Sequence, residues 1–326
     1  MWKYAAGSVV VGTALYGLIK YFAGGVCRCS ARLDGQVIVI TGANSGIGKA
    51  LALELAKRGA TLVLACRDTN KGLDAKTYIL RQLKNENIKV FVKHLDLCSI
   101  SSIRKFSVNL IHEFSEIYAL VNNAAVFYHP QHLTEDEYEV TFQTNYLGHF
   151  ILTHHLQTLL KNSVHGRIVN VASEAHRIVN VYDLNAVTKC QVEFRDHFIA
   201  YGVSKLALIL FTRELSKRLR NTNIIVNAVN PGNVETSIFR NFPALCNPWL
   251  YALQWPIRLI IIKNPQQGAQ TLLHALLTTN RSTGQYYSDC KLALPSPIAA
   301  NDKIASEYYQ LTLEILADKF NTESDC

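Results

Sequence analysis

Short apolar runs alternate with longer amphipathic stretches through the middle of the chain. Runs of aliphatic residues without polar alternation are typical of strands buried on both faces of a parallel sheet. We predict such strands at residues 36–40, 61–65, 89–92, 118–121, 167–171 and 224–229, separated by helix-period segments, the first over about 47–58. Regular alternation of this kind predicts an α/β fold with a doubly wound parallel sheet of the Rossmann type.

The flanks of this pattern set the predicted domain organisation. We place one dinucleotide-binding catalytic domain at residues 35–295, preceded by a basic linker at 24–34 and followed by a C-terminal helical extension at 296–326. Pro243, Pro248 and Pro256, with several large apolar residues, interrupt the alternation at 233–265, which predicts a substrate-loop insertion over the carboxyl edge of the sheet. Residues 182–184 fall in an excursion before the next helix.

Residues 1–23 form the most apolar segment of the chain. Lys3 and Lys20 interrupt it, and aromatic residues stand near both ends. A helix of about 20 such residues spans a bilayer, so we predict an uncleaved transmembrane anchor. A cleaved signal peptide is the alternative, because Ala23-Gly24-Gly25 resembles its exit site. The positive residues that follow the segment favour a catalytic domain facing the cytosol.

Composition narrows the class of protein. The 326 residues are 49% hydrophobic and 18% charged, with a formal net charge of +8 that is dispersed rather than clustered. Dispersed charge argues against nucleic-acid binding and for a basic globular surface with some attraction to membranes. The eight cysteines lack paired CxxC spacing, which indicates reduced thiols and predicts no metal site. Self-association into a homo-oligomer is left open by the sequence.

A glycine-bearing turn follows the first predicted strand and opens the first helix. It reads Thr41-Gly42-Ala43-Asn44-Ser45-Gly46-Ile47-Gly48. Small residues allow the backbone to approach a pyrophosphate, and the helix N-terminus offers free N–H groups and positive dipole charge. The turn therefore predicts a dinucleotide site.

A second motif, Tyr201-Gly202-Val203-Ser204-Lys205, sets a phenol and an ammonium four residues apart in a predicted helix. Both side chains emerge on one face at this spacing. Because a nearby cation favours phenolate, we expect Lys205 to lower the pKa of Tyr201 and make it an acid–base group.

Together the two motifs resemble the short-chain dehydrogenase/reductase family over about residues 35–295. The resemblance implies four catalytic residues: Tyr201 as proton donor, Lys205, Ser173 holding the reacting oxygen, and Asn145 in a proton relay. Asn122-Asn123-Ala124-Ala125 resembles a family motif that ends in Gly, so Ala125 departs from the pattern. The implied cofactor-binding residues are Gly42, Asn44, Ser45, Gly46, Ile47, Gly48, Arg67, Lys71, Asp96, Leu97, Asn123, Ala124, Tyr201, Lys205, Pro231, Gly232, Val234 and Thr236.

Cofactor choice depends on the residue that follows the second strand. An acidic group there binds the ribose hydroxyls of NAD, whereas a basic group pairs with the 2′-phosphate of NADP. The sequence places Arg67 first, then Asp68, with Lys71 one turn on. We therefore predict NADP(H).

Four further segments narrow the resemblance to one branch of the family. Residues 21–28, 65–68, 211–215 and 286–290 are similar to the membrane-anchored microsomal retinol dehydrogenases. That branch implies reversible reduction of retinal or related apolar aldehydes with NADPH at the endoplasmic reticulum membrane. Phe239, Phe242, Leu245, Trp249, Leu250, Tyr251, Leu253 and Trp255 are candidates to line an apolar tunnel. Another lipid carbonyl, such as a fatty aldehyde, steroid or polyprenoid, and a non-catalytic nucleotide-binding regulator are the alternatives.

Overall fold

The structure is a computed structural model. It describes residues 17, 18, 20, 22–85, 87–188, 196–239, 242, 243, 255, 258 and 261–320. Most of the predicted membrane anchor and most of the predicted substrate-loop insertion lie outside these residues, including Leu245, Trp249, Leu250, Tyr251 and Leu253. Within the described part of the chain, no helix has the length and apolar character needed to cross a membrane.

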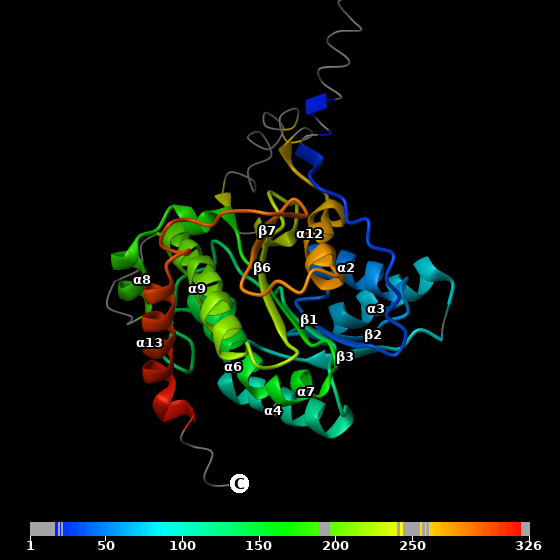
Figure 1. Cartoon of the computed structure of the whole chain (residues 1–326), viewed down its shortest axis with the longest axis horizontal. Coiled ribbons are helices and arrows are strands. Elements are labelled where there is room, and N and C mark those ends of the chain that lie inside the picture. The colour runs from blue at the N-terminus through cyan, green and yellow to red at the C-terminus, as the bar shows by residue number, and fades with distance from the viewer. Residues whose placement is uncertain are drawn as a thin grey trace, which may run out of the picture.

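One sheet organises the fold (Figure 1). Its strands are β1 (Val37–Thr41), β2 (Thr61–Cys66), β3 (Val90–His94), β4 (Ala119–Asn122), β5 (Arg167–Val171), β6 (Ile225–Asn230), β7 (Tyr286–Ser288) and β8 (Lys291–Leu292). They lie in the order β3-β2-β1-β4-β5-β6-β7-β8, and all neighbours are parallel except β7 and β8. The six predicted strands and the doubly wound topology are thereby confirmed.

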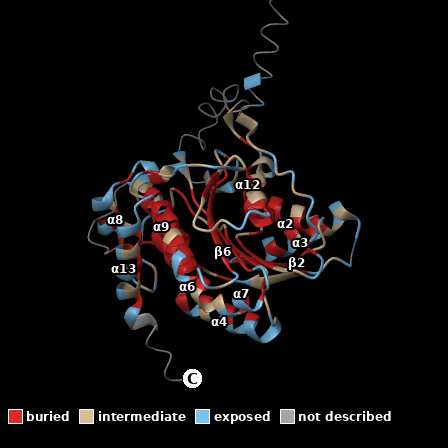
Figure 2. Ribbon diagram, in the orientation of Figure 1, coloured by how far each residue is buried: buried red, intermediate tan, exposed pale blue. Residues whose placement is uncertain are grey.

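The strands are apolar on both faces because helices cover both sides. Along β1, Ile38 and Ile40 contribute to one core cluster and Val39 to the other. Side chains alternate across a strand, so an uninterrupted apolar run supplies two cores at once. The burial colouring shows this as a red centre between two layers of helices (Figure 2).

The helices form two layers. One comprises α2 (Gly46–Ala56), α3 (Thr69–Leu83) and α12 (Pro265–Leu277). The other comprises α4 (Ile100–Glu113), α6 (Gly148–His155), α7 (Gln157–Asn162), α9 (His197–Arg218) and α13 (Asp302–Phe320). The remaining short elements are α5 (Val140–Phe142), α8 (Val181–Thr188), a π-helical turn at Gln143–Leu147 and 3₁₀ turns at Glu174–Arg177 and Ser237–Phe239.

The C-terminal helix α13 belongs to the core. Tyr308, Tyr309 and Leu316 are buried in the same cluster as α9, and the Tyr146 hydroxyl lies 2.8 Å from that of Thr312. Arg213 of α9 donates two hydrogen bonds to Asp302 at 3.0 and 2.6 Å, fixing the start of the helix. The predicted extension is therefore a structural part of the catalytic domain.

Candidate active site

A cavity of about 520 Å³ opens at the carboxyl ends of the neighbouring strands β1 and β4, where the chain leaves the two strands toward opposite faces of the sheet. Ligands in doubly wound folds bind at this switch point because the helices on either side leave a crevice there. Among the predicted cofactor residues, twelve line the cavity: Gly42, Asn44, Ser45, Gly46, Ile47, Arg67, Lys71, Asp96, Leu97, Asn123, Ala124 and Thr236. Gly48, Tyr201, Lys205, Pro231, Gly232 and Val234 do not line it.

The glycine turn is shaped by close backbone approach. Gly42 and Gly46 have φ of +64° and +53°, a region that side chains disfavour. A Cβ on Gly48 would lie 2.6 Å from both the Asn123 amide nitrogen and the Gly42 carbonyl oxygen. The turn thus presents bare backbone at the N-terminus of α2, and this cradle fits the pyrophosphate of a dinucleotide.

Thr41, at the end of β1, joins the turn to β4. Its hydroxyl oxygen accepts the backbone N–H groups of Asn123 and Ala124, both at 2.9 Å. The Asn123 amide donates in return to the Thr41 carbonyl at 2.8 Å. The backbone of Ala125 lies outside the left-handed region, so the residue that departs from the family pattern introduces no strain.

At the far end of the cavity, Asp68 and Arg67 have different surroundings. Asp68 caps α3 by accepting the Lys71 N–H at 3.1 Å, and its carboxylate lies 3.4 Å from the Lys71 ammonium. The Lys71 N–H also holds the pKa of Asp68 below its usual range. Arg67 is exposed and has no carboxylate partner among the described residues. Arg67 is therefore the group free to meet an anion.

Asp96 and the loop after β6 border the site on its two sides. The Asp96 carboxylate accepts the Cys98 N–H at 3.0 Å, which shapes the turn before α4. Gly232 has φ of +80°, and the buried ammonium of Lys263 donates to the Pro231 carbonyl at 3.3 Å. Lys263, which the sequence did not single out, thus supports the loop that carries Val234.

Helix α9 carries Tyr201 and Lys205 on one face, as the spacing predicts. Asp196 caps the helix by accepting the Phe198 and Ile199 N–H groups at 2.8 and 3.4 Å. The Lys205 ammonium is buried, donates to the Val171 carbonyl at 2.8 Å, and lies 5.5 Å from the Tyr201 ring centroid. Lys205 is therefore anchored to the end of β5.

Burial acts on both members of this pair. It raises the pKa of Tyr201 to about 12, although the hydrogen bond with Ser173 lowers that pKa in part. It lowers the pKa of Lys205 to about 7. The net shift of Tyr201 is upward, opposite to the direction expected from the Tyr–Lys spacing. Desolvation disfavours the charged form of each group, and for Tyr201 the hydrogen bond with Ser173 offsets it only in part.

Ser173 lies where β5 ends, next to Tyr201. Its hydroxyl accepts the Ala175 N–H at 3.2 Å, which opens the 3₁₀ turn. The ring of His176 lies 2.6 Å from the Ser173 carbonyl and donates to it through Nδ1. Backbone and ring contacts therefore fix Ser173 with its hydroxyl toward the phenol.

Asn145 lies within the π-helical turn. Its amide accepts the Val126 N–H at 2.8 Å and donates to the Val126 carbonyl and the Ser204 hydroxyl, both at 3.0 Å. π-helical turns widen a helix by one residue and often occur at functional sites. The amide thereby ties α9 to the chain that follows β4.

His149 completes this network, and the sequence analysis missed its role. Its Nδ1 lies 2.9 Å from the Asn145 carbonyl oxygen, and its Nε2 lies 2.9 Å from the Thr41 hydroxyl. A carbonyl only accepts, so Nδ1 carries the proton and Nε2 accepts from Thr41. Burial lowers the pKa of His149 to about 3, which keeps the ring neutral. His149 therefore joins Asn145 to the glycine turn.

Aromatic rings surround Tyr201 on the side away from the cavity. Phe127 lies 5.0 Å from the Tyr201 ring, 5.2 Å from Phe198 and 5.9 Å from Phe242, all between centroids. Tyr128 lies 5.5 Å from Phe242. Phe198 is 44% exposed, so an apolar surface leads from solvent to the phenol. Of these rings, only Phe242 was predicted to line a substrate tunnel.

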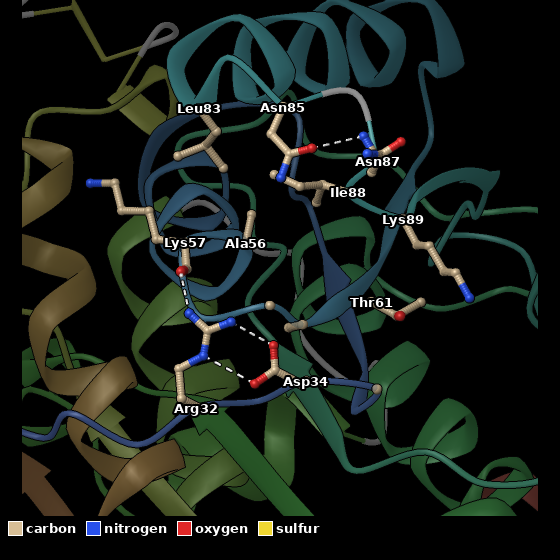
Figure 3. A pocket seen from close by; sticks show the side chains of 13 residues that line it. Arg32, Asp34, Ala56, Lys57, Thr61, Leu83, Asn85, Asn87, Ile88 and Lys89 are labelled. Carbon is tan, nitrogen blue, oxygen red and sulfur yellow. Dashed lines mark hydrogen bonds and ion pairs between the residues drawn. The ribbon is translucent and has the colours of Figure 1, made fainter.

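A second cavity, of about 480 Å³, lies at the opposite edge of the sheet (Figure 3). Its walls include Arg32 and Asp34, which form an ion pair across its mouth, and Lys57, whose carbonyl accepts from Arg32 at 3.5 Å. None of the predicted site residues lines it. The chemistry therefore belongs to the cavity at the switch point.

Comparisons with known proteins agree with this geometry. The family described as short chain dehydrogenase matches residues 36–245. The chain is 42% identical over 301 residues to retinol dehydrogenase 12 of Homo sapiens, covering 91% of each protein. It is 40% identical over 300 residues to retinol dehydrogenase 11 of Homo sapiens, again covering 91% of each.

Solved structures show the same fold. An uncharacterized protein from Mycobacterium paratuberculosis superposes with a TM-score of 0.69 at 29% identity, covering 90% of this chain and 98% of that one. A short-chain dehydrogenase from Shigella flexneri in complex with NADP gives a TM-score of 0.61 at 22% identity, covering 79% and 98%. Sequence, fold and site together place this chain among the oxidoreductases of the short-chain dehydrogenase family.

Proposed function

We propose that this protein reduces an apolar aldehyde to its alcohol with NADPH, and that the aldehyde is retinal. The observation that carries the proposal is the meeting of Ser173, Tyr201 and Lys205 beside a dinucleotide cavity and under a cover of aromatic rings. The relatives named retinol dehydrogenases support the substrate class.

In this mechanism the chain positions the carbonyl and supplies the proton. NADPH, when bound, supplies the hydride. The Ser173 hydroxyl holds the carbonyl oxygen while the Tyr201 phenol donates its proton to that oxygen. Lys205 holds the nicotinamide ribose, and Asn145 links this lysine to solvent through a proton relay.

The raised pKa of Tyr201 suits the role of proton donor. A phenol with a pKa of about 12 stays protonated at neutral pH, as a proton donor must. Alcohol oxidation needs the phenolate instead. That species becomes more abundant as the pH rises toward the Tyr201 pKa.

The surroundings of Arg67 support NADPH over NADH. Asp68 is engaged as the cap of α3 and as the partner of Lys71, whereas Arg67 lines the cavity without a carboxylate partner in the described chain. A guanidinium recognises a phosphate by charge-assisted hydrogen bonds. The 2′-phosphate of NADPH is the anion that fits this position.

We also propose that the catalytic domain faces the cytosol, anchored by residues 1–23 in the endoplasmic reticulum membrane. The apolar anchor sequence and the basic residues after it support this orientation. The aromatic approach to Tyr201 would then receive substrate that partitions into the membrane.

A substrate screen tests the proposed activity. We expect NADPH oxidation by the membrane-bound protein with all-trans-retinal, with lower kcat/KM for a fatty aldehyde and a steroid ketone. Tyr201→Phe should lower kcat by roughly 10²–10⁴-fold, because the proton donor is lost, while NADPH binding persists. A higher kcat/KM for the fatty aldehyde or steroid would replace the retinoid, and full activity of Tyr201→Phe would refute the mechanism.

The pH dependence of the two directions tests the role of the phenol. Retinol oxidation should accelerate between roughly pH 6 and 9, whereas retinal reduction should not. Stopped-flow absorbance measures both rates.

Replacing Arg67 tests cofactor choice. Arg67→Leu should weaken NADPH binding by about 10–100-fold and leave NADH binding unchanged, because one charge-assisted contact to the 2′-phosphate is lost. Isothermal titration with both cofactors measures the effect. Arg81→Leu, an exposed change at the other end of α3, is the matched control. An unchanged preference for NADPH in Arg67→Leu would exclude this role.

Two variants of His149 separate positioning from packing. His149→Phe keeps a ring but removes both hydrogen bonds, so we expect unfolding free energy to fall by about 1–3 kcal/mol and kcat by about tenfold. His149→Asn keeps a donor near the Asn145 carbonyl and should restore most of kcat. Thermal unfolding and steady-state kinetics give the two readouts. Equal kcat in both variants would show that the imidazole only packs.

Glycosylation tests the orientation of the domain. Asn280-Arg281-Ser282 is a sequon, and Asn280 is exposed in the structure. A cytosolic domain should show no endoglycosidase-sensitive mobility shift in microsomes, and Asn280→Gln should migrate identically. A sequon added ahead of residue 1 is the positive control, because it should be modified. A shift that Asn280→Gln abolishes would place the domain in the lumen.

A further inference from the structure

The segment that enters the catalytic domain lies against α12, on the side of the sheet away from α9 (Figure 1). The Cys27 N–H donates to the Gln270 side chain of α12 at 3.1 Å. The Cys29 carbonyl accepts from Arg58 at 3.4 Å, and the Leu33 N–H donates to the Arg58 carbonyl at 2.8 Å. Three contacts at successive points thus hold this segment in place.

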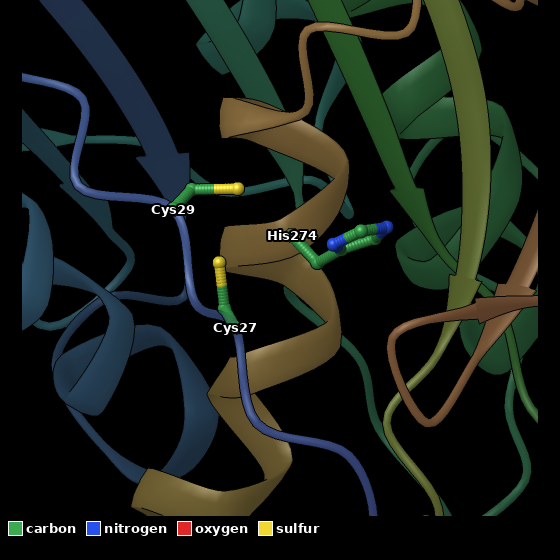
Figure 4. A group of neighbouring side chains, drawn as sticks. All are labelled: Cys27, Cys29 and His274. Atoms are coloured by element: carbon green, nitrogen blue, oxygen red, sulfur yellow. The ribbon is translucent and has the colours of Figure 1, made fainter.

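Within this contact, three side chains converge (Figure 4). The sulfur atoms of Cys27 and Cys29 and a ring nitrogen of His274 all lie within 4.8 Å of one another. The two cysteines belong to the entering segment, and His274 belongs to α12. All three are partly buried, so solvent does not surround the group.

The donor set is the one that Zn²⁺ prefers. Thiolates and imidazole are standard zinc ligands, and carboxylates are absent from the cluster. Zn–S and Zn–N bonds of about 2.3 and 2.0–2.1 Å in a tetrahedron set ligand atoms about 3.5–3.8 Å apart. The observed spacing is therefore within reach of small side-chain rotations.

A third thiol stands beside the cluster. Cys290 follows β7, and its backbone N–H donates to Thr271 of α12 at 3.3 Å, one turn before His274. A Cβ on Gly25 would lie 2.9 Å from the Cβ of Cys290, so the entering segment passes directly over it. Cys290 therefore lies beside the cluster of Cys27, Cys29 and His274 but is not a member of it.

We propose that Cys27, Cys29 and His274 bind a structural Zn²⁺ ion that fastens the segment entering the catalytic domain to α12. The proposal is independent of the substrate and cofactor proposed above. Binding of the ion would affect the cofactor site because α12 packs closely against it. A Cβ on Gly268 of α12 would lie 2.6 Å from Val234 and 3.3 Å from Ile47. The ion would stabilise the helix that supports both sides of the cavity.

A redox-sensing thiol pair is the main alternative. Sensor cysteines are exposed and rich in thiolate. Cys27 and Cys29 are instead partly buried, and a ring nitrogen of His274 lies within 4.8 Å of both sulfur atoms. These properties favour a metal ligand over a sensor.

Metal content tests the proposal directly. Full-length protein purified in detergent should hold about one equivalent of Zn²⁺ by mass spectrometry, and Cys27→Ser, Cys29→Ser and His274→Gln should each hold less than about a fifth of that. Cys98→Ser, which changes a thiol on another part of the chain, should retain the metal. Cobalt-loaded protein should show thiolate charge-transfer absorption that Cys29→Ser reduces.

Limited proteolysis gives a second readout that needs no activity. Arg28 lies between the two cysteines and is exposed, so trypsin can test how firmly the segment is held. Adding phenanthroline should accelerate cleavage after Arg28 several-fold in the unaltered protein and have no effect on Cys29→Ser, which should already be cleaved quickly. Metal content that none of the three substitutions lowers, or a Cys27–Cys29 disulfide in peptide mapping, would overturn the proposal.

Discussion

The hydroxyl of Thr41 is the contact on which the site depends. At the end of β1 it receives two backbone N–H groups from the chain after β4 and lies within hydrogen-bond distance of the ring of His149. β1 and β4 are paired neighbours, and the chain leaves their carboxyl ends toward opposite faces of the sheet, which creates the cavity between its walls. One side chain therefore holds the walls at a fixed distance. Through His149 the same contact extends to Asn145, so the glycine turn and the π-helical turn share one support.

Burial is the second organising effect. Desolvation raises the pKa of Tyr201 and lowers the pKa of Lys205, so it favours the neutral form of both side chains. Charge on either group must therefore be stabilised by what binds beside it. Any ligand that binds beside Tyr201 and Lys205 would therefore affect their charges more strongly than it would affect those of an exposed pair.

Sequence patterns were sufficient to predict those elements that depend only on residues close together in the chain. The central strands were found within one or two residues because an apolar run needs only its own composition to be recognised. β7 has only three residues, and α8 spans the expected excursion at 182–184, so neither element showed a clear hydrophobic period in the sequence. The pKa of Tyr201 could not be anticipated, because spacing reveals a neighbour but not the depth of burial. Lys263, His149 and Phe127 were missed since their partners are distant in sequence. The contact between Cys27 and His274 was hidden for the same reason.

The position of α13 affects how the protein can be made. Tyr308, Tyr309 and Leu316 belong to a core cluster to which α9 also contributes. Until α13 has formed, the face of α9 that it covers is open to solvent. A chain truncated ahead of α13 would expose an apolar surface, and quality-control proteases would meet that surface before any substrate did.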